Sequence, residues 1–164
     1  FYLGEHGWFD KRWMYEESLR VPFVISWPGR IKPCTRVKAL SQNIDFAPTF
    51  LDAAGAQTPA DMHGASLLPL LSGKNIADWR QSIYYHYYEE GEHNVPAHEG
   101  VRTERFKLID FYTRKLWEFY DLDNDPQELV NQYDNLEYEK QVQQLHAELL
   151  RLKKLYNAPK VKSN

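Results

Sequence analysis

Hydrophobic and polar positions follow two different spacings along this chain. Near its C-terminal end, apolar residues recur at intervals of three or four: Tyr138, Val142, Leu145, Leu149, Leu152 and Tyr156. This spacing predicts one long amphipathic helix over about 136–156, which we expect to dock on a sheet. Asp134 and Glu137 are its predicted N-terminal cap pair, and Asn157 lies where the helix should end.

Upstream of that helix the spacing changes to that of β-strands. Stretches rich in aromatic and β-branched residues occupy 83–88, 100–103, 106–112 and 115–122. Short polar turns separate the last three, and a longer polar loop over 89–99 follows the first. Four successive strands without an intervening helix predict an antiparallel sheet.

The first half of the chain has a third pattern. Val21 to Trp27 is a continuous apolar run closed by a Pro-Gly turn, which predicts a buried strand, and 37–40 predicts a shorter one. Helical spacing over 45–54 ends at Gly55, and 67–71 predicts a short helical turn. The order strand, strand, helix is typical of the closing part of an α/β layer.

These patterns divide the chain into three parts. We expect an α/β part over 1–75, a small antiparallel-sheet subdomain with its terminal helix over 76–158, and a disordered tail over 159–164. The predicted fold class is α/β for the whole protein and α+β within this stretch: the end of an α/β sheet, then a four-stranded antiparallel sheet and a long C-terminal helix.

Composition narrows the function classes. The 164 residues carry a net charge of −3, which argues against a nucleic-acid partner, and no apolar run approaches the length of a membrane span. Cys34 is the only cysteine, so an internal disulfide is excluded. Aromatic residues make up 15% of the chain. They serve either ordinary packing, the more common use, or a surface that faces carbohydrate.

The densest motif opens the chain. Gly4-Glu5-His6-Gly7 is followed by Lys11-Arg12, and then by Tyr15-Glu16-Glu17-Ser18 and Arg20-Val21-Pro22. A glycine-flanked turn with a cationic doublet is suited to hold an anion beyond a strand end. The segment resembles the sulfatase family, which has a Gly-Asp/Glu-His-Gly-x-x-x-Lys segment before a Tyr-Glu-x-Ser-x-Arg-x-Pro stretch.

The resemblance continues along nearly the whole chain. Further signatures of the same family are Ile44-Asp45 to Gly55, His63-Gly64 to Leu71, and Val101-Arg102-Thr103 to Glu128. It implies an alkaline-phosphatase-like fold, of which this stretch would be the C-terminal portion. It also implies hydrolysis of sulfate esters of a carbohydrate, in a periplasmic, extracellular or lysosomal protein.

The resemblance assigns roles to four residues. Lys11 would contact the sulfate group, as a compact positive charge suits, although most lysines are solvated surface residues. His6 would either support its loop or contact the substrate. Arg12 and His98 would recognise the sugar. The alternative for Arg12 is a salt bridge to Asp10 or Glu16, and the alternative for His98 is that it is an ordinary loop histidine. His93 is a weaker candidate of the same kind.

Two components of the family's chemistry do not match this sequence. The family's nucleophile is a formylglycine made from cysteine in a Cys-x-Pro-Ser-Arg motif, whereas Cys34 lies in Pro-Cys-Thr-Arg and more plausibly begins a strand. The family's metal is typically calcium, and its ligand set is not recognisable here. A zinc site among His86, His93 and His98 lacks regular ligand spacing. We therefore expect formylglycine and calcium on residues upstream, and no sulfatase activity from this chain alone.

Two other functions stay open. A phosphonate monoester hydrolase or phosphodiesterase of the same superfamily would share the anion-binding lysine and differ at the nucleophile. A non-catalytic carbohydrate-binding module would retain sugar binding on the aromatic small sheet. If the first half is part of a sheet cut at its edge, its backbone hydrogen-bonding groups and apolar surface would be exposed. We would then expect the isolated chain to dimerise.

Overall fold

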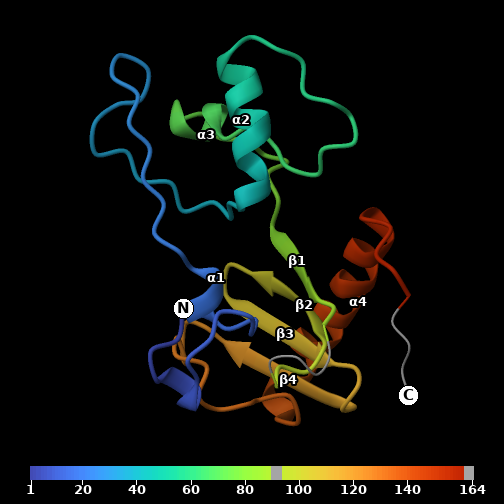
Figure 1. The fold of residues 1–164 in the computed structure, drawn as a ribbon. Helices are drawn as coiled ribbons and strands as arrows, with labels where there is room; N and C mark the ends of the chain where they lie inside the picture. The colour runs from blue at the N-terminus through green and yellow to red at the C-terminus, as the bar shows by residue number, and fades with distance from the viewer. Residues whose placement is uncertain (90–93, 161–164) are drawn as a thin grey trace. The chain divides into compact units, whose positions relative to one another are not determined.

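The computed structural model describes residues 1–89 and 94–160. It contains an antiparallel sheet in the order β1-β2-β3-β4, formed by Ser82–Tyr87, His98–Thr103, Phe106–Phe111 and Leu116–Asp121 (Figure 1). Each strand pairs with its neighbour in sequence, so tight turns suffice between β2, β3 and β4. The predicted four-stranded sheet is confirmed. His98 and Glu99, which were placed in the loop, belong to β2.

The terminal helix α4, Glu139–Leu155, packs on one face of this sheet. Its predicted stripe is buried at Val142, Leu145, Leu149 and Leu152, against Val101, Leu108 and Phe119 of the strands. The 3-10 turn η3, Leu136–Tyr138, precedes it. The predicted cap is wrong: Asn135, not Asp134, accepts a hydrogen bond from the Glu137 N–H, at 3.0 Å, and it caps η3. The N-cap residue of α4 itself, Tyr138, makes no side-chain cap hydrogen bond. At the other end, Asn157 has a left-handed φ of 48°, which agrees with the predicted stop.

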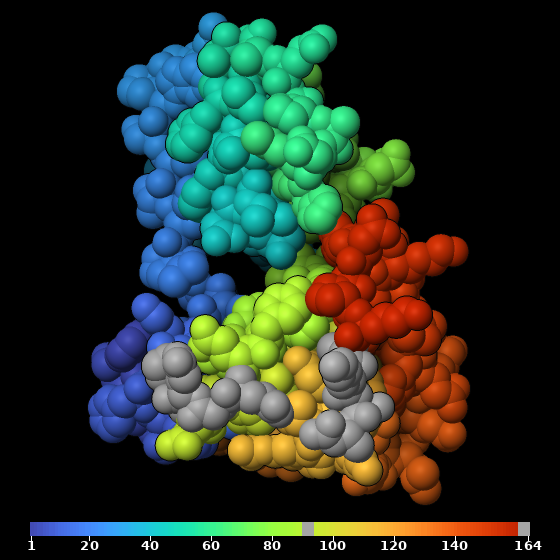
Figure 2. Space-filling view, turned by 45° about the vertical axis from the view of Figure 1, so that its right-hand side comes forward, coloured from blue at the N-terminus to red at the C-terminus, as the bar shows by residue number. Residues whose placement is uncertain are grey.

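The other face of the sheet is covered by the opening residues of the chain. Tyr2, Trp13, Met14 and Tyr15 form a second buried cluster with Ile109, Phe111 and Tyr120 of the strands. This segment contains the 3-10 turn η1, Glu5–Gly7, and the short helix α1, Glu16–Leu19. Figure 2 shows the opening segment (blue) and α4 (red) on opposite sides of the strands (green to orange). A Cβ on Gly100 of β2 would lie 2.6 Å from the Met14 sulfur and 2.4 Å from the Leu108 carbonyl, so this contact requires glycine.

Residues 1–22 and 82–164 form one compact unit, and 23–81 form another. This grouping differs from the expected division at residue 75, because the opening segment packs on the sheet. The assignment of either part to a domain of a longer protein stays a prediction. The predicted tail over 159–164 lies mostly outside the described residues.

Residues 23–81 contain the 3-10 turn η2, Asn43–Asp45, with α2, Phe46–Ala53, and α3, Leu68–Leu71. Both predicted helices are confirmed, and Gly55 follows α2 with a φ of 70°. Inside the unit, the buried Asp45 carboxylate accepts two hydrogen bonds of 2.6 Å from Arg80. Gly64 lies so close to the Ile44 carbonyl that no side chain fits there.

The two strands predicted in this half are wrong. Neither 21–27 nor 37–40 forms a strand, and Val24 is 90% exposed. No strand of the described chain lies beside them to accept their hydrogen bonds, so their apolar composition alone does not produce a sheet. Cys34 lies in an exposed turn with a φ of 61° rather than at a strand start.

Candidate active site

The opening loop is closed on itself by backbone hydrogen bonds. The Gly4 N–H donates to the Trp8 carbonyl at 2.9 Å, and the Tyr2 N–H donates to the Asp10 carbonyl at 2.8 Å. Gly4 and Gly7 have φ values of 124° and 74°, where a side chain would be strained. The two glycines of the motif are therefore required by the shape of the loop that holds His6.

Lys11 lies at the end of this loop, and hydrogen bonds hold its backbone on both sides. The Asp10 carboxylate accepts the N–H groups of Lys11 and Arg12 at 2.5 and 2.7 Å, and the Ser18 hydroxyl donates to the Lys11 carbonyl at 2.5 Å. Among the described residues, no carboxylate lies within ion-pairing distance of the Lys11 ammonium group. An exposed, unpaired cation on a fixed backbone is suited to bind an anion.

Arg12 forms the salt bridge that was considered as its alternative role. Its Nη1 lies 2.5 Å from the Asp10 Oδ2, and its carbonyl accepts a hydrogen bond of 2.8 Å from the Tyr85 hydroxyl. Burial would raise the pKa of Asp10, but these N–H and guanidinium donors lower it. Arg12 thus holds the loop to the sheet through Asp10 and Tyr85, and its role toward a sugar stays a prediction.

His6 is positioned by an aromatic ring rather than by a hydrogen bond. Its imidazole stacks on Tyr15 with a centroid distance of 4.4 Å and an interplanar angle of 8°. Its Nε2 lies 3.6 Å from the Glu17 carboxylate, and the side chain is 12% exposed. These contacts favour the loop-supporting interpretation of His6.

His98 was expected in an exposed polar loop, but it lies in the buried interior of the sheet unit. It is fully buried on β2, its Nδ1 is 2.8 Å from the Pro96 carbonyl, and Trp13, Tyr87 and Phe111 surround it. Burial lowers the pKa of His98 to about 4, so the imidazole is neutral at pH 7. His93, the weaker candidate, lies outside the described residues.

A buried ionic network, which no sequence motif indicated, joins two of the family signatures, the opening motif and the stretch from Val101 to Glu128. Lys107 of β3 is fully buried, and its Nζ lies 3.0 Å from Glu16 and 2.6 Å from Glu128. Arg102 of β2 binds Glu16 through two hydrogen bonds of 3.0 and 3.1 Å. Glu128 also accepts the Glu16 N–H at 2.6 Å. The network ties the segment after Lys11 to the sheet.

The two carboxylates of this network differ in charge environment. Burial alone would raise the pKa of Glu16, but Arg102 and Lys107 together lower it to about 2. Glu128 has only Lys107 as a cationic partner, and burial raises its pKa. Since an unpaired charge at such a depth is costly, we interpret the network as structural support for the loop that carries Lys11.

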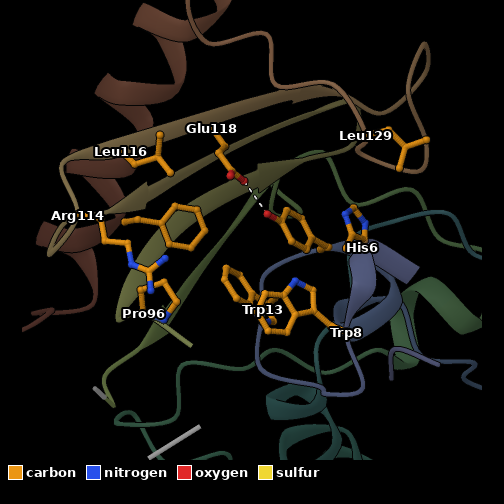
Figure 3. Close-up of a pocket in the computed structure, with 10 residues that line it drawn as sticks. His6, Trp8, Trp13, Pro96, Arg114, Leu116, Glu118 and Leu129 are labelled. Atoms are coloured by element: carbon orange, nitrogen blue, oxygen red, sulfur yellow. Dashed lines mark hydrogen bonds between the residues drawn. The ribbon is translucent and has the colours of Figure 1, made fainter. Parts of the chain in front are cut away.

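A pocket of ≈ 410 Å³ lies beside the same loop, against β4 (Figure 3). The loop contributes His6, Trp8, Trp13 and Tyr15 to its walls. From the sheet side it is lined by Arg114, Glu118 and apolar residues such as Leu116. Of the four predicted site residues, only His6 lines it. The aromatic content was the one sequence signal for this pocket, because Trp8 and Trp13 belong to no recognised motif.

The expected calcium cannot be assigned to these residues. In the described part of the chain, no group of three or more His, Cys, Asp or Glu side chains could hold a metal ion. Likewise, none of the described helices has the length and apolar character needed to cross a membrane.

Comparison with known proteins agrees with the geometry. A family model for the C-terminal part of N-sulphoglucosamine sulphohydrolase matches residues 4–155. An N-acetylglucosamine-6-O-sulfatase of Bacteroides thetaiotaomicron is 51% identical over 160 residues, which are 95% of this chain and 29% of that protein. This chain therefore spans less than a third of that relative.

Two solved structures extend the comparison. One is an enzyme in complex with its substrate, D-glucosamine-2-N,6-O-disulfate; it has a TM-score of 0.91 and 50% identity over 95% of this chain and 32% of its own. The other is a phosphonate monoester hydrolase of Silicibacter pomeroyi, with a TM-score of 0.79 and 26% identity over 92% of this chain and 32% of its own. The sulfatase resemblance and the fold class are confirmed, and the chain belongs to the family of N-sulphoglucosamine sulphohydrolase C-terminal regions.

Proposed function

We propose that this chain is the C-terminal part of a sulfatase that hydrolyses a sulfate ester of a carbohydrate. The observation that supports this most directly is the Lys11 ammonium group, which has no carboxylate partner among the described residues and lies on a loop fixed by Asp10 and Ser18. This loop lies within the region that the family model matches. Cleavage of a sulfate ester develops negative charge on the sulfuryl oxygens and on the departing oxygen, and a fixed cation stabilises that charge.

For the substrate we propose a 6-O-sulfated glucosamine unit. The proposal rests on the 51% identical N-acetylglucosamine-6-O-sulfatase and on the neighbour that holds D-glucosamine-2-N,6-O-disulfate. Both relatives are about three times as long as this chain. Their specificity therefore enters here as a hypothesis about the longer protein.

Within this chain we assign the sulfate contact to Lys11 and support of its loop to His6. Arg12 and His98 stay proposed sugar-recognition residues; Arg12 is paired with Asp10, and His98 is fully buried. Calcium and formylglycine, which the family uses, would be supplied by residues outside this chain. By itself the 164-residue chain should therefore release no sulfate.

The test is a comparison of Lys11→Ala with wild type in the longer polypeptide that carries this sequence. We expect sulfate release from N-acetylglucosamine-6-sulfate to fall in kcat/KM by about 100-fold or more, the size of effect seen when one charge-stabilising donor is removed. Lys32→Ala is the matched control, because Lys32 is also exposed and lies far from the loop in sequence.

Two outcomes would contradict the proposal. Full activity of Lys11→Ala would show that the ammonium group contacts solvent alone. Hydrolysis of phosphonate monoesters without any sulfate release would favour the alternative function, for which the Silicibacter pomeroyi enzyme is the structural precedent.

A further inference from the structure

The pocket beside the opening loop has a wall of aromatic rings. Trp8 and Trp13 lie with their ring centroids 5.0 Å apart, and Tyr15 stacks on Trp13 at 6.0 Å and 7°. Figure 3 shows Trp8, Trp13 and His6 on one side of the pocket, with Arg114, Leu116 and Glu118 around the rest. Flat apolar rings of this kind bind the C–H faces of sugar rings as well as other apolar surfaces.

Two donors in this wall have no partner among the described residues. The indole Nε1 of Trp13, a residue only 7% exposed, is buried without an acceptor. The exposed Arg114 side chain lines the pocket, and its guanidinium takes part in no hydrogen bond or ion pair with the described residues. For the buried Trp13 Nε1 the missing acceptor is costly, which indicates that a ligand or water lies beside it. Arg114 is exposed, so its guanidinium is free to pair with an anionic ligand in exchange for water.

The carboxylate of Glu118, an acceptor that lines the pocket, is held in place by two hydroxyl groups. The Glu118 Oε2 accepts hydrogen bonds from the hydroxyls of Tyr15 and Tyr120 at 2.8 and 2.9 Å. Both phenols are buried, which raises the pKa of each well above the usual range and keeps them as donors. The other carboxylate oxygen remains available to a hydroxyl group.

We propose that this pocket is a binding subsite for an acidic sugar residue, one that carries a carboxylate or sulfate group. The aromatic wall would face the sugar ring, Glu118 would accept a hydroxyl, and Arg114 would pair with the anionic group through its planar fork. The volume of ≈ 410 Å³ falls in the range of small-ligand sites. An acidic ligand is favoured over a neutral sugar, because it alone can form a charge-assisted pair with the exposed guanidinium.

The proposed subsite extends the proposed function. Its effect on turnover depends on the sulfatase proposal, whereas its binding of a ligand does not. His6 lines the pocket and belongs to the same loop as Lys11, so a sugar in the pocket would neighbour the sulfated unit. The longer enzyme should therefore distinguish substrates by the residue linked to the sulfated glucosamine.

The experiment uses that longer enzyme and three substrates: 6-O-sulfated N-acetylglucosamine alone, the same unit linked to a hexuronic acid, and the same unit linked to galactose. Wild type should have the highest kcat/KM for the acidic disaccharide. Arg114→Met should lower that value by about 10-fold or more, the range for a charged hydrogen bond. The monosaccharide and the galactose-linked substrate should change less than twofold. Lys115→Met is the matched control, because Lys115 is the neighbouring exposed cation and does not line the pocket.

A second measurement separates this inference from the sulfatase proposal. Binding of an unsulfated disaccharide of hexuronic acid and N-acetylglucosamine to wild type and Arg114→Met, followed by calorimetry, requires no turnover. If wild type binds this disaccharide and Arg114→Met does not, the subsite is supported even if no sulfate is released. Equal losses with all three substrates, or acidic-disaccharide binding that Arg114→Met leaves unchanged, would overturn it.

Discussion

The two compact units of this chain have very different interiors. The sheet unit, 1–22 and 82–164, buries one apolar cluster on each face of the sheet and holds a buried ionic network. In the unit over 23–81, burial is largely confined to the contact between α2 and its neighbouring turns, while Val24 and Phe50 are 90% and 72% exposed. The hydrophobic pattern of the two halves is nevertheless similarly strong.

This difference shows what a hydrophobic pattern can predict. An apolar run states that a segment gains free energy when it is buried, but a neighbouring element decides whether burial occurs. The run in β1 has β2 beside it and forms a strand, whereas 21–27 has no strand beside it within the described chain. The exposed apolar residues of 23–81 are also why we still expect the isolated chain to associate, which light scattering can measure.

The largest expected effect tests the ionic interior of the sheet unit. Lys107→Met leaves the buried carboxylates of Glu16 and Glu128 without their shared cation. The free energy of unfolding should fall by about 3–5 kcal/mol, as when one partner of a buried ion pair is removed. Urea unfolding followed by circular dichroism measures this change. A loss below about 1 kcal/mol would mean that the network is solvated and contributes little.

A pair of matched truncations compares the units directly. Leu108→Ala, at a fully buried position of β3, should cost about 2–5 kcal/mol of unfolding free energy. Phe50→Ala, at a position 72% exposed on α2, should change it by no more than about 0.5 kcal/mol. If the two variants lost equal stability in urea, Phe50 would be buried in solution and the comparison would be wrong.

The pH dependence of stability tests two buried groups with opposite signs. His98 has a native pKa of about 4 because of burial, so the unfolded chain binds its proton first as the pH falls below about 6.5. Stability from this group is therefore lost between about pH 6.5 and pH 4, by up to about 3 kcal/mol. Burial and the Glu99 charge raise the pKa of Asp110 from 3.8 to about 6. In that group the native state binds the proton first, so stability is gained as the pH falls from 6 toward 3.8.

Variants separate these two contributions. Asp110→Asn removes the gain, so between pH 7.5 and pH 5 its urea midpoint should fall more than that of wild type. His98→Leu removes the loss, so its midpoint should fall less over the same interval. The Asp110 effect should be the smaller of the two, because its carboxylate is only half buried and partly screened by solvent. Parallel pH profiles for all three proteins would show that neither group has the assigned pKa.

Prediction from sequence succeeded wherever the signal and its partner were local. The strands from β1 to β4 and the α4 stripe were located to within a few residues, because the period of the apolar positions identifies both the element and its buried face. The ionic network was missed because Glu16, Lys107 and Glu128 are distant in sequence, and charged residues are ordinarily at the surface. The pocket was missed for a similar reason, because its walls come from segments distant in sequence. Arg114 lies in the turn after β3, and nothing in that turn predicts that the opening loop places its aromatic rings nearby.

The cap of η3, the 3-10 turn that precedes the terminal helix, shows that local signals do not decide between neighbouring residues, and it gives the smallest prediction. Asp134 and Asn135 are both good cap residues, so the sequence alone does not choose between them. Only the Asn135 side chain accepts the Glu137 N–H. Asn135→Ala should therefore cost about 1 kcal/mol of unfolding free energy, whereas Asp134→Ala should cost no more than about 0.5 kcal/mol. The reverse ranking in urea would place the start of η3 one residue earlier and restore the cap expected from sequence.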